Sequence, residues 1–438
     1  MLATSRIIQK PRNFMNRIIL IGNGFDLAHG MKTSYNDFLK DFWKNTITEI
    51  HKFEGKEIFE NDDIIIKNVP SQWLPGYEYS NLIKTLKNSN SKIEFKNIFL
   101  YKISAKAYFQ NWVDIENEYY ELLKKSYNKN EGEILNYDYG IEQLNSDFER
   151  IKELLEGYLL KIELEFDKSQ NQNFSRTRYR IEQKIYSNFK LKDFSEITLN
   201  QKIDSEYADF KKDVQAFKEN KIDRDDLSEK RLSLISAIGV DADREKFKQL
   251  ILSQDGHLFI DLIPNHTLFL NFNYTFTELH YQIPDRMSKS KNGKEVEFIH
   301  IHGSNRKKDK NPIIFGFGDE LDEDYKKIER LNDNNYLENI KSIRYLDTDN
   351  YKRLLEFVNS GNYQIMIMGH SCGTSDRTLL NTVFENENCA SIKVFYHNKG
   401  DNKDNFSDII KNISRSFNDK ALMRDRVVNK TYCEPLTE

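Results

Sequence analysis

The chain has 438 residues, which is enough for one large domain with an insertion or for two to three domains, and enough to bury a sizeable core. Its net charge is −4 and both signs of charge are spread throughout, so no overall field would recruit nucleic acid or an anionic membrane. No apolar run approaches the length of a membrane span, and no apolar h-region follows the basic N-terminus. Neither a transmembrane helix nor a secretory signal is predicted.

Cysteine usage and the first residues indicate where the protein acts. Cys372, Cys389 and Cys433 are an odd, widely spaced set that fits neither a disulfide framework nor a zinc pair. We therefore expect a protein of the reducing cytoplasm. Residues 1–14 are predicted to be a disordered leader, which would make Met15 a natural start.

A buried-strand pattern runs directly into a glycine loop near the start of the chain. The apolar run at 18–21 (I-I-L-I) predicts a strand covered on both faces, as in a parallel sheet. Gly22 and Gly24 let the backbone turn sharply and approach a ligand, with amides available for a phosphate at the next helix start. The segment predicts a nucleotide site. A tight turn without a ligand stays the alternative, because Leu27 stands where a dinucleotide fingerprint has its third glycine.

Further elements follow in chain order. A capping-box pattern at Ser34 and Asp37 predicts the start of a helix. Between roughly residues 95 and 255, apolar residues recur at helical spacing, as in Phe148, Ile151 and Leu155, among many charged residues. Short apolar segments bounded by Gly, Asn or Asp predict further strands at 266–271, 296–302, 312–317, 363–368 and 391–396.

These elements predict an α/β fold with a Rossmann-like, mostly parallel sheet that is interrupted by a large helical insertion. Residues 15–95 would form the first part of the nucleotide-binding domain. Residues 96–258 would form the helical insertion, and residues 259–438 the second part of the α/β domain.

Polar motifs after three of the predicted strands supply candidate chemistry. Because α/β sheets bind ligands at the carboxyl ends of their strands, we expect these motifs to meet at one site. They are L-N-F-N-Y-T around Asn273, H-I-H-G-S from His300 to Ser304, and M-G-H-S-C-G-T-S-D from Met368 to Asp376.

The motifs resemble those of the bacteriophage abortive-infection AbiH family. Its signature is similar to I-L-I-G-N-G-F-D-L-A-H-G with a following T-S-Y at 19–35, and W-V-D-I-E-N-E-Y at 112–119 is similar to a second family motif. A more distant resemblance is to sirtuin-like NAD-binding domains. Their four ordered motifs correspond to segments at Gly22, Asn273, Ile301 and Gly369, whereas residues 45–260 have no counterpart.

The resemblance implies a site and a ligand. It places catalytic roles on Asn273 and His302, makes NAD the substrate or ligand, and calls for no metal. Thr275 stands where the sirtuin pattern has an aspartate, and the four zinc cysteines of the deacetylating members are missing, which favours a defence-type NAD hydrolase or a nucleotide sensor. The residues expected at the cofactor are Gly22, Asn23, Gly24, Phe25, Asp26, Thr33, Thr275, Gly303, Ser304, Gly369, Ser371 and Asp376, with His29, Asp114 and Glu116 as accessory residues.

The residue types also suit the chemistry without the family. Cleavage of the nicotinamide–ribose bond passes through an oxocarbenium-like centre, so the site must hold the ribose and exclude bulk water. An asparagine such as Asn273 can orient a water or a ribose hydroxyl, and a histidine such as His302 can accept a proton. A turn asparagine and a core histidine are the structural alternatives.

The same residues fit two other chemistries only in part. The G-x-S-x-G pattern at 369–373 formally fits a hydrolase elbow, but only 67 residues and one histidine, His397, follow Ser371. His300 and His302 alternate as in a metal pair but lack a third ligand in the sequence.

Two further functions stay open. One is a magnesium-dependent nuclease of phage or host RNA that uses Asp26, Asp114 and Glu116. The other is a non-catalytic nucleotide sensor whose helical region binds a phage trigger protein. A homo-oligomer is open in each case.

Overall fold

The structure, a computed structural model, describes most of the chain. The described residues are 15–53, 57–69, 76–110, 113–127, 139–168, 172–282, 295–306, 308, 310–401 and 403–437. The predicted leader at 1–14 and Trp112 of the W-V-D-I-E-N-E-Y motif lie outside them.

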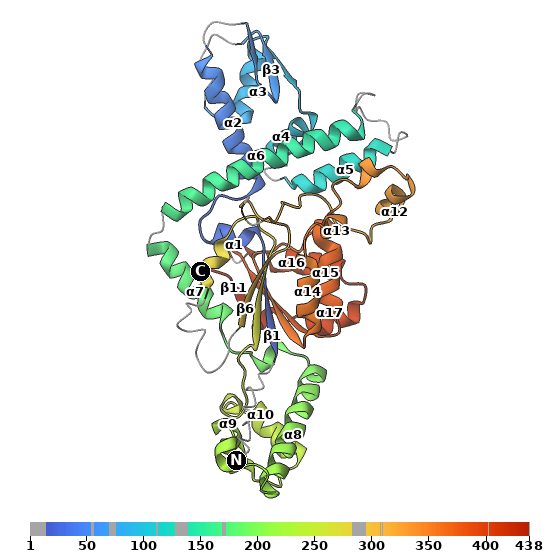
Figure 1. Ribbon diagram of the computed structural model, residues 1–438. Helices are drawn as coiled ribbons and strands as arrows, with labels where there is room; N and C mark the ends of the chain where they lie inside the picture. Colours follow the sequence, from blue (N-terminus) through green and yellow to red (C-terminus); the bar gives the residue numbers. More distant parts are fainter. Residues whose placement is uncertain are drawn as a thin grey trace, which may run out of the picture.

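A six-stranded sheet occupies the centre of the molecule (Figure 1), and every pair of neighbouring strands in it is parallel. The strand order is β11-β8-β7-β1-β5-β6. From β1 the chain adds β5 and β6 on one side, and it then crosses over to add β7, β8 and β11 on the other. The strands are β1 (Asn16–Ile21), β5 (His266–Asn271), β6 (Glu295–His300), β7 (Tyr363–Met368), β8 (Cys389–Tyr396) and β11 (Glu434–Pro435).

The two faces of β1 explain its uninterrupted apolar sequence. Ile18 and Leu20 pack into a core formed with α14 to α17, whereas Ile19 and Ile21 pack into a second core with α7. All four side chains are fully buried, so the predicted strand with two covered faces is confirmed. The covering helices are α14 (Asn350–Asn359), α15 (Arg377–Glu385), α16 (Phe406–Ser416), α17 (Lys420–Arg426) and, on the second face, α7 (Gln172–Ile185).

The chain between β1 and β5 forms two lobes at opposite ends of the sheet (Figure 1). The upper lobe (residues 35–168) packs around Trp43, Phe99 and Phe148 and includes a small antiparallel sheet. At the start of its first helix, α2, the hydroxyl of Ser34 accepts a hydrogen bond from the amide of Asp37 at 3.1 Å, so the predicted helix start is confirmed. Its elements are α2 (Tyr35–Lys52), β2 (Ile58–Glu60), β3 (Ile64–Lys67), α3 (Tyr79–Asn88), β4 (Lys92–Phe95), α4 (Ile98–Gln110), α5 (Ile115–Tyr127) and α6 (Ile141–Lys168).

The lower lobe (residues 189–262) is helical and packs around Phe210, Leu234 and Phe247. Met15 and Ala390, at the amino ends of β1 and β8, belong to the same core, so this lobe lies at the end of the sheet where the strands begin. The upper lobe lies at the other end, where the strands finish (Figure 1). The elements of the lower lobe are η1 (Leu191–Asp193), α8 (Glu196–Lys218), η2 (Arg224–Asp226), α9 (Glu229–Ile238), α10 (Arg244–Leu252) and η3 (Gly256–Leu258).

Short elements complete the described part of the chain. They are α1 (Asn23–Ala28), η4 (Thr277–Tyr281), α12 (Glu323–Arg330), η6 (Asn334–Leu337), α13 (Lys341–Arg344), η7 (Thr374–Asp376), β9 (Asn398–Gly400), β10 (Lys403–Asp404) and η8 (Lys430–Tyr432).

The strand predicted at 312–317 is wrong. The segment is extended, but its only sheet-like contact among the described residues is a single bridge from Phe317 to Ile340. Ile313 and Phe315 pack into the core of the upper lobe, whereas Ile314 packs into the core of the sheet. The apolar run arises because the segment lies between two cores, and it does not require a strand partner.

Candidate functional site

Two loops cross at the carboxyl ends of the neighbouring strands β1 and β7. The amide of Gly24 donates a hydrogen bond to the carbonyl of Gly369 at 2.8 Å, and a β-carbon on Gly24 would lie 2.7 Å from that oxygen. A β-carbon on Gly22 would lie 2.6 Å from the α-carbon of His370. Gly369 has φ +81°, and a β-carbon there would lie 2.0 Å from the amide nitrogen of Phe25. We call this contact the glycine crossing. Loop packing alone requires its glycines.

A cavity of about 870 Å³ opens beside the glycine crossing, between the sheet and the upper lobe. This volume lies toward the upper end of the range for small-molecule sites, about 300–1,000 Å³. The loops after β1, β5, β6, β7 and β8 all contribute to its wall. The predicted site residues that line it are Gly22, Asn23, Gly24, Asp26, Thr33, Asp114, Glu116, Asn273, Thr275, His302, Gly369, Ser371 and Asp376.

Four predicted site residues lie outside this lining. Phe25 is fully buried in the core that covers one face of the sheet. His29 lies behind it, with Nδ1 2.6 Å from the carbonyl of Phe25 and Nε2 2.5 Å from the hydroxyl of Tyr281, and burial lowers the pKa of His29 to about 4. Gly303 and Ser304 form the turn after β6, where the amide of Ser304 donates to the carbonyl of Asn311 at 3.1 Å.

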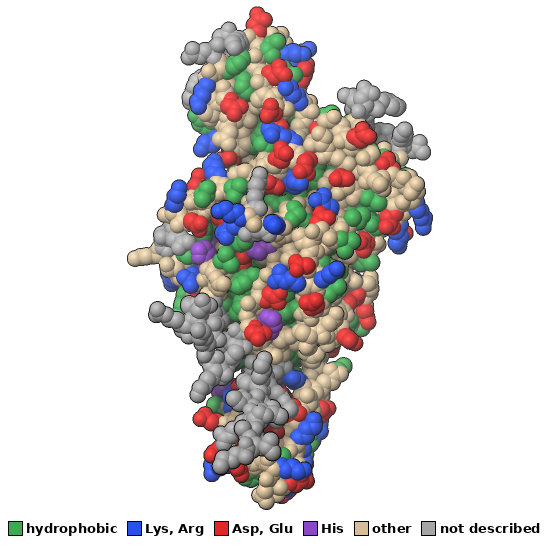
Figure 2. Space-filling view, viewed as in Figure 1, with side chains coloured by type: hydrophobic (Ala, Val, Ile, Leu, Met, Phe, Trp, Pro, Cys, Tyr) green, Lys and Arg blue, Asp and Glu red, His purple; other side chains and the backbone are tan. Residues whose placement is uncertain are grey.

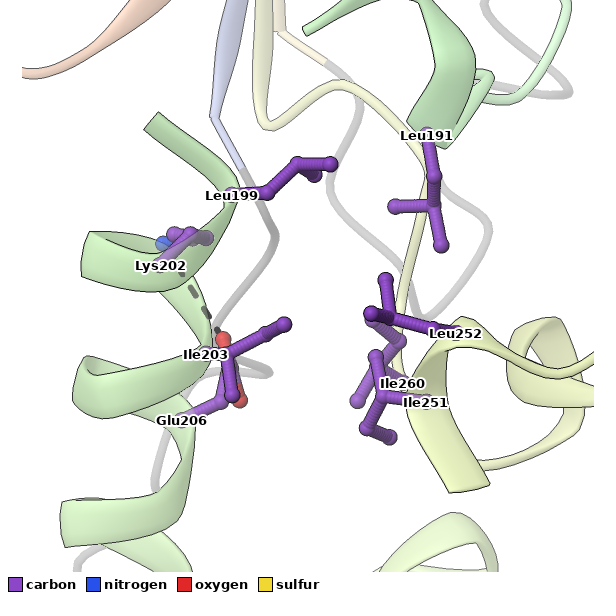
Figure 3. A pocket seen from close by; sticks show the side chains of 8 residues that line it. All are labelled: Leu191, Leu199, Lys202, Ile203, Glu206, Ile251, Leu252 and Ile260. Atoms are coloured by element: carbon purple, nitrogen blue, oxygen red, sulfur yellow. Dashed lines mark ion pairs between the residues drawn. The ribbon is translucent and has the colours of Figure 1, made fainter. Parts of the chain in front are cut away.

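A second hollow lies in the lower lobe (Figure 3), but it holds only about 10 Å³. Its wall is apolar apart from Lys202 and Glu206, whose charged atoms lie 4.0 Å apart. Such a volume is close to that of one water, so the large cavity is the candidate site.

A buried carboxylate lies beside the glycine crossing. Asp26 accepts hydrogen bonds from the hydroxyls of Thr275 at 2.5 Å and Thr277 at 2.7 Å, and it also interacts with the amide of Asn273. The same amide donates to the carbonyl of Gly22 at 3.1 Å. Burial raises the pKa of Asp26 to about 6, although the threonine hydrogen bonds oppose the shift. Thr275, which follows β5, therefore contacts an aspartate of α1, which follows the neighbouring strand β1.

His302 lies in the turn after β6 and is only 3% exposed. Its Nε2 atom lies 3.2 Å from the hydroxyl of Tyr345 and 3.4 Å from the carboxylate of Asp376, so the hydrogen bond to the backbone of Phe272 comes from Nδ1. Burial, followed by the charge of Lys341, lowers the pKa of His302 to about 3. The ring is therefore neutral at neutral pH, with Nε2 accepting the tyrosine hydroxyl.

A buried lysine joins two of the acidic residues that line the cavity. The Nζ atom of Lys341, in α13, lies 2.9 Å from Glu116 in α5 and 2.8 Å from Asp376 in η7. Lys341 is 1% exposed. We call these three residues the charged cluster.

The pKa values of the two carboxylates in the cluster are shifted in opposite directions. Burial raises the pKa of Glu116 to about 7 in spite of the lysine. Burial acts the same way on Asp376, but Lys341 and then His302 outweigh it, so the pKa of Asp376 falls below its ordinary value. Burial alone would lower the pKa of Lys341, but the two carboxylates raise it.

Sequence reasoning missed several residues of this site. His370 stands inside the quoted G-H-S-C-G-T-S-D motif; its Nδ1 accepts the amide of Cys372 at 2.9 Å, which leaves Nε2 3.4 Å from Asp376. Lys341 and Tyr345 belong to no motif, and Lys341 lies 225 residues from Glu116 in the sequence, so no local signal could have found them. The far end of the cavity was missed as well, and it is formed by Tyr396, His397, Lys399, Asn405, Ile409, Leu436 and Thr437.

The pair of histidines weighed for a metal does not converge. His300 contacts Glu278 at 2.8 Å, whereas His302 faces Asp376. Among the described residues, no three His, Cys, Asp or Glu side chains gather in a way that could hold a metal ion. None of the helices that the structure describes is both long and apolar enough to cross a bilayer.

Comparisons with known proteins give one match. The family described as "Bacteriophage abortive infection AbiH" matches residues 18–398, which include the glycine crossing, the charged cluster, Asn273 and His302. No curated protein and no solved structure matches the chain.

Proposed function

Because this chain belongs to the bacteriophage abortive infection AbiH family, we propose that it acts in defence against phage by binding NAD in the large cavity and cleaving the nicotinamide–ribose bond. Loss of NAD would then stop the growth of an infected cell. The family suggests the role in abortive infection, and the geometry of the cavity supports the choice of ligand.

Sheet topology supports a dinucleotide. Numbered along the chain, the six strands of the sheet lie in the order 3-2-1-4-5-6, which is the order of doubly wound dinucleotide-binding folds and fits the Rossmann-like, sirtuin-like assignment. In such folds the ligand lies outside the carboxyl ends of the strands, where the order reverses. Here that point is between β1 and β7, and the glycine crossing and the cavity lie there.

The observation that carries the proposal is the charge and residue content of the cavity. Its acidic residues are Asp26, Asp114, Glu116 and Asp376, and Asn273 and His302 lie among them. The nicotinamide ring of NAD carries a positive charge, and bond cleavage moves that charge onto the ribose. Carboxylates held in a buried site stabilise such a developing positive charge. The far end, with His397 and Lys399, is better suited to the anionic half of the ligand.

Two residues have defined roles in this proposal. The amide of Asn273 is fixed between Gly22 and Asp26, so it would hold a ribose hydroxyl or the attacking water in one orientation. His302, neutral and tied to Tyr345, would help to enclose the ribose.

The test compares NAD loss and nicotinamide release in four proteins: the parent, Asn273→Ala, His302→Ala and the double variant. We expect each single variant to lose most of the activity. The double variant should be little worse, because residues that act in one transition state are not additive. Circular dichroism and thermal melting check folding, and the exposed His257→Ala in the lower lobe is the matched control. Well-folded single variants that consume NAD at the parental rate would refute the proposal.

The alternatives are tested on the same four proteins by measuring RNA loss with and without a chelator, and NAD binding. Asp26 is only 1% exposed, and its carboxylate already accepts hydrogen bonds from Thr275, Thr277 and Asn273, which favours NAD cleavage over a nuclease that needs this carboxylate for magnesium. On the face shown in Figure 2, basic and acidic side chains are interspersed, with no continuous basic surface for RNA. RNA loss that a chelator abolishes would support the nuclease. NAD binding without turnover would support the sensor of a phage protein.

A further inference from the structure

The charged cluster raises the question of which group in the cavity can take up a proton. Cleavage of NAD by water releases one proton, so the site needs an acceptor within reach of the attacking water. His302, to which the resemblance assigns a catalytic role, and Glu116 are two candidates on the cavity wall. Asp26 also lines the wall, but its carboxylate already accepts three side-chain hydrogen bonds.

The surroundings of His302 argue against it. Both ring nitrogens already have partners, because Nδ1 faces the backbone of Phe272 and Nε2 faces Tyr345 and Asp376. The positive charge of Lys341 also opposes protonation of the ring, and burial acts in the same direction. A base this weak is a poor match for a reaction near neutral pH.

Glu116 has free capacity to accept a proton. One carboxylate oxygen accepts the amide of Gly316 at 3.3 Å and the other faces Lys341 at 2.9 Å. A carboxylate offers about four acceptor sites, so roughly two remain for a water in the cavity. The side chain lines the cavity although it is largely buried, which keeps it within reach of a bound ligand while bulk water is excluded.

The charged neighbours of Glu116 act on its ionisation in opposite directions. Lys341 favours the ionised form, whereas Asp376 in η7 and Asp114 before α5 oppose it. Tyr35 in α2, Tyr274 after β5 and Tyr345 after α13 also face it, and their pKa values lie above the ordinary range, so they stay neutral. The result is a pair of carboxyls in one cavity with pKa values moved apart, Glu116 upward and Asp376 downward. Such pairs mark acid–base assignments in enzymes.

We propose that Glu116 accepts the proton of the attacking water, and that Lys341 is the positioning residue that holds Glu116 and Asp376 at the cavity. The inference rests on NAD cleavage as the proposed function. The water oxygen bonds to C1′ of the ribose as the C1′–N bond breaks, nicotinamide leaves with that electron pair, and the water proton passes to a carboxylate oxygen of Glu116. Asp376 stays ionised and faces the positive centre.

The first experiment is the pH profile of nicotinamide release. Parental activity should rise with one ionisation near pH 7, the value to which burial raises the pKa of Glu116. In Glu116→Gln the rate of nicotinamide release should fall about 10²–10⁴-fold, and its rise with pH, the pH-dependent limb, should disappear. Glu116→Asp should keep the limb at a reduced rate. The control is Glu118→Gln, which removes the same charge from the same helix. Glu118 is paired with Lys106, and this variant should keep the parental rate and pH profile.

Lys341→Met tests the positioning role in the same assay. Because the lysine lowers the pKa of Glu116, its loss should move the limb to higher pH, which a merely structural role would not do. A limb that stays in Glu116→Gln, or that disappears in a folded His302→Asn variant, would overturn the proposal.

The second experiment needs no activity. The pKa of Glu116 is higher in the folded protein than its ordinary value of 4.5, so the stability it contributes is fully present below about pH 4.5 and is lost as pH rises toward 7. Glu116→Gln removes this dependence, so its melting temperature should rise relative to the parent between about pH 5 and 8. Parallel melting curves would overturn the proposal even if NAD is consumed. Diverging curves without NAD turnover would instead overturn NAD cleavage, and with it the role of Glu116 in that step.

Discussion

The glycine crossing and the charged cluster line the same cavity but are built in different ways. The crossing is a backbone contact between two loops, each of which directly follows a buried strand. The cluster is a side-chain contact between three elements, α5, α13 and η7. The first depends on the absence of a β-carbon and the second on a balance of buried charge. The two should therefore fail in different ways when residues are changed.

The largest effect is expected for Lys341→Met. This change leaves two buried carboxylates without their partner, and breaking a buried ion pair from one side costs about 3–5 kcal/mol. Chemical unfolding measures the loss. Lys67→Met, which breaks the exposed pair with Glu94, is the control and should cost about 0–1 kcal/mol.

A double variant separates charge from packing in the cluster. Lys341→Met with Glu116→Gln removes the lysine and one of the two carboxylates together, so it should recover part of the lost stability. If Lys341→Met costs no more than the Lys67 control, the cluster does not depend on charge balance, and the contrast with the glycine crossing fails.

Gly24→Val should destabilise the protein less than Lys341→Met does, but it should abolish ligand binding. The added β-carbon would meet the backbone of Gly369 at 2.7 Å, and such overpacking costs about 1–3 kcal/mol. We expect the variant to lose the thermal stabilisation that NAD or ADP-ribose gives the parent. Gly157→Ala in α6 meets nothing within 4 Å, so it should be neutral or stabilising by about 0.5–1 kcal/mol. Unchanged stabilisation by either ligand in Gly24→Val would remove the crossing from the binding site.

The contrast also separates what the sequence could predict from what it could not. β1, its glycine loop and the polar ends of β5 and β7 were predictable, because a covered strand and a sharp turn leave local patterns. The same reasoning failed at 312–317, where two cores produce a strand-like apolar run without a strand. A local pattern reports which side chains are buried, but it does not report what covers them.

Lys341 shows a second limit of prediction from the sequence. It is one of many lysines in the chain, and only the fold brings it between Glu116 and Asp376. The carboxylates could be proposed because they stand in motifs, but their unequal pKa values depend on a neighbour that the sequence does not indicate. The role of His302 is affected in the same way, because its partner Tyr345 also lies outside every motif.

The smallest effect at any one step of pH, and the sharpest comparison within the cavity, is the pH dependence of His302→Asn. The pKa of His302 in the folded protein is about 3, below its ordinary 6.5, so the unfolded chain binds the extra proton first. The stability from the neutral ring is therefore present above about pH 6.5 and is lost as pH falls toward 3. The stability difference between parent and His302→Asn should rise with pH in this window, by at most about 1.4 kcal/mol per pH unit. For Glu116→Gln the same difference should fall as pH rises from about 4.5 to 7, because that group has its pKa raised. Unfolding free energies measured across this range should give lines of opposite slope. Burial favours the neutral form of both groups, which is the deprotonated form of the histidine and the protonated form of the carboxyl. Two lines of the same sign would mean that burial does not control the ionisation of one of them.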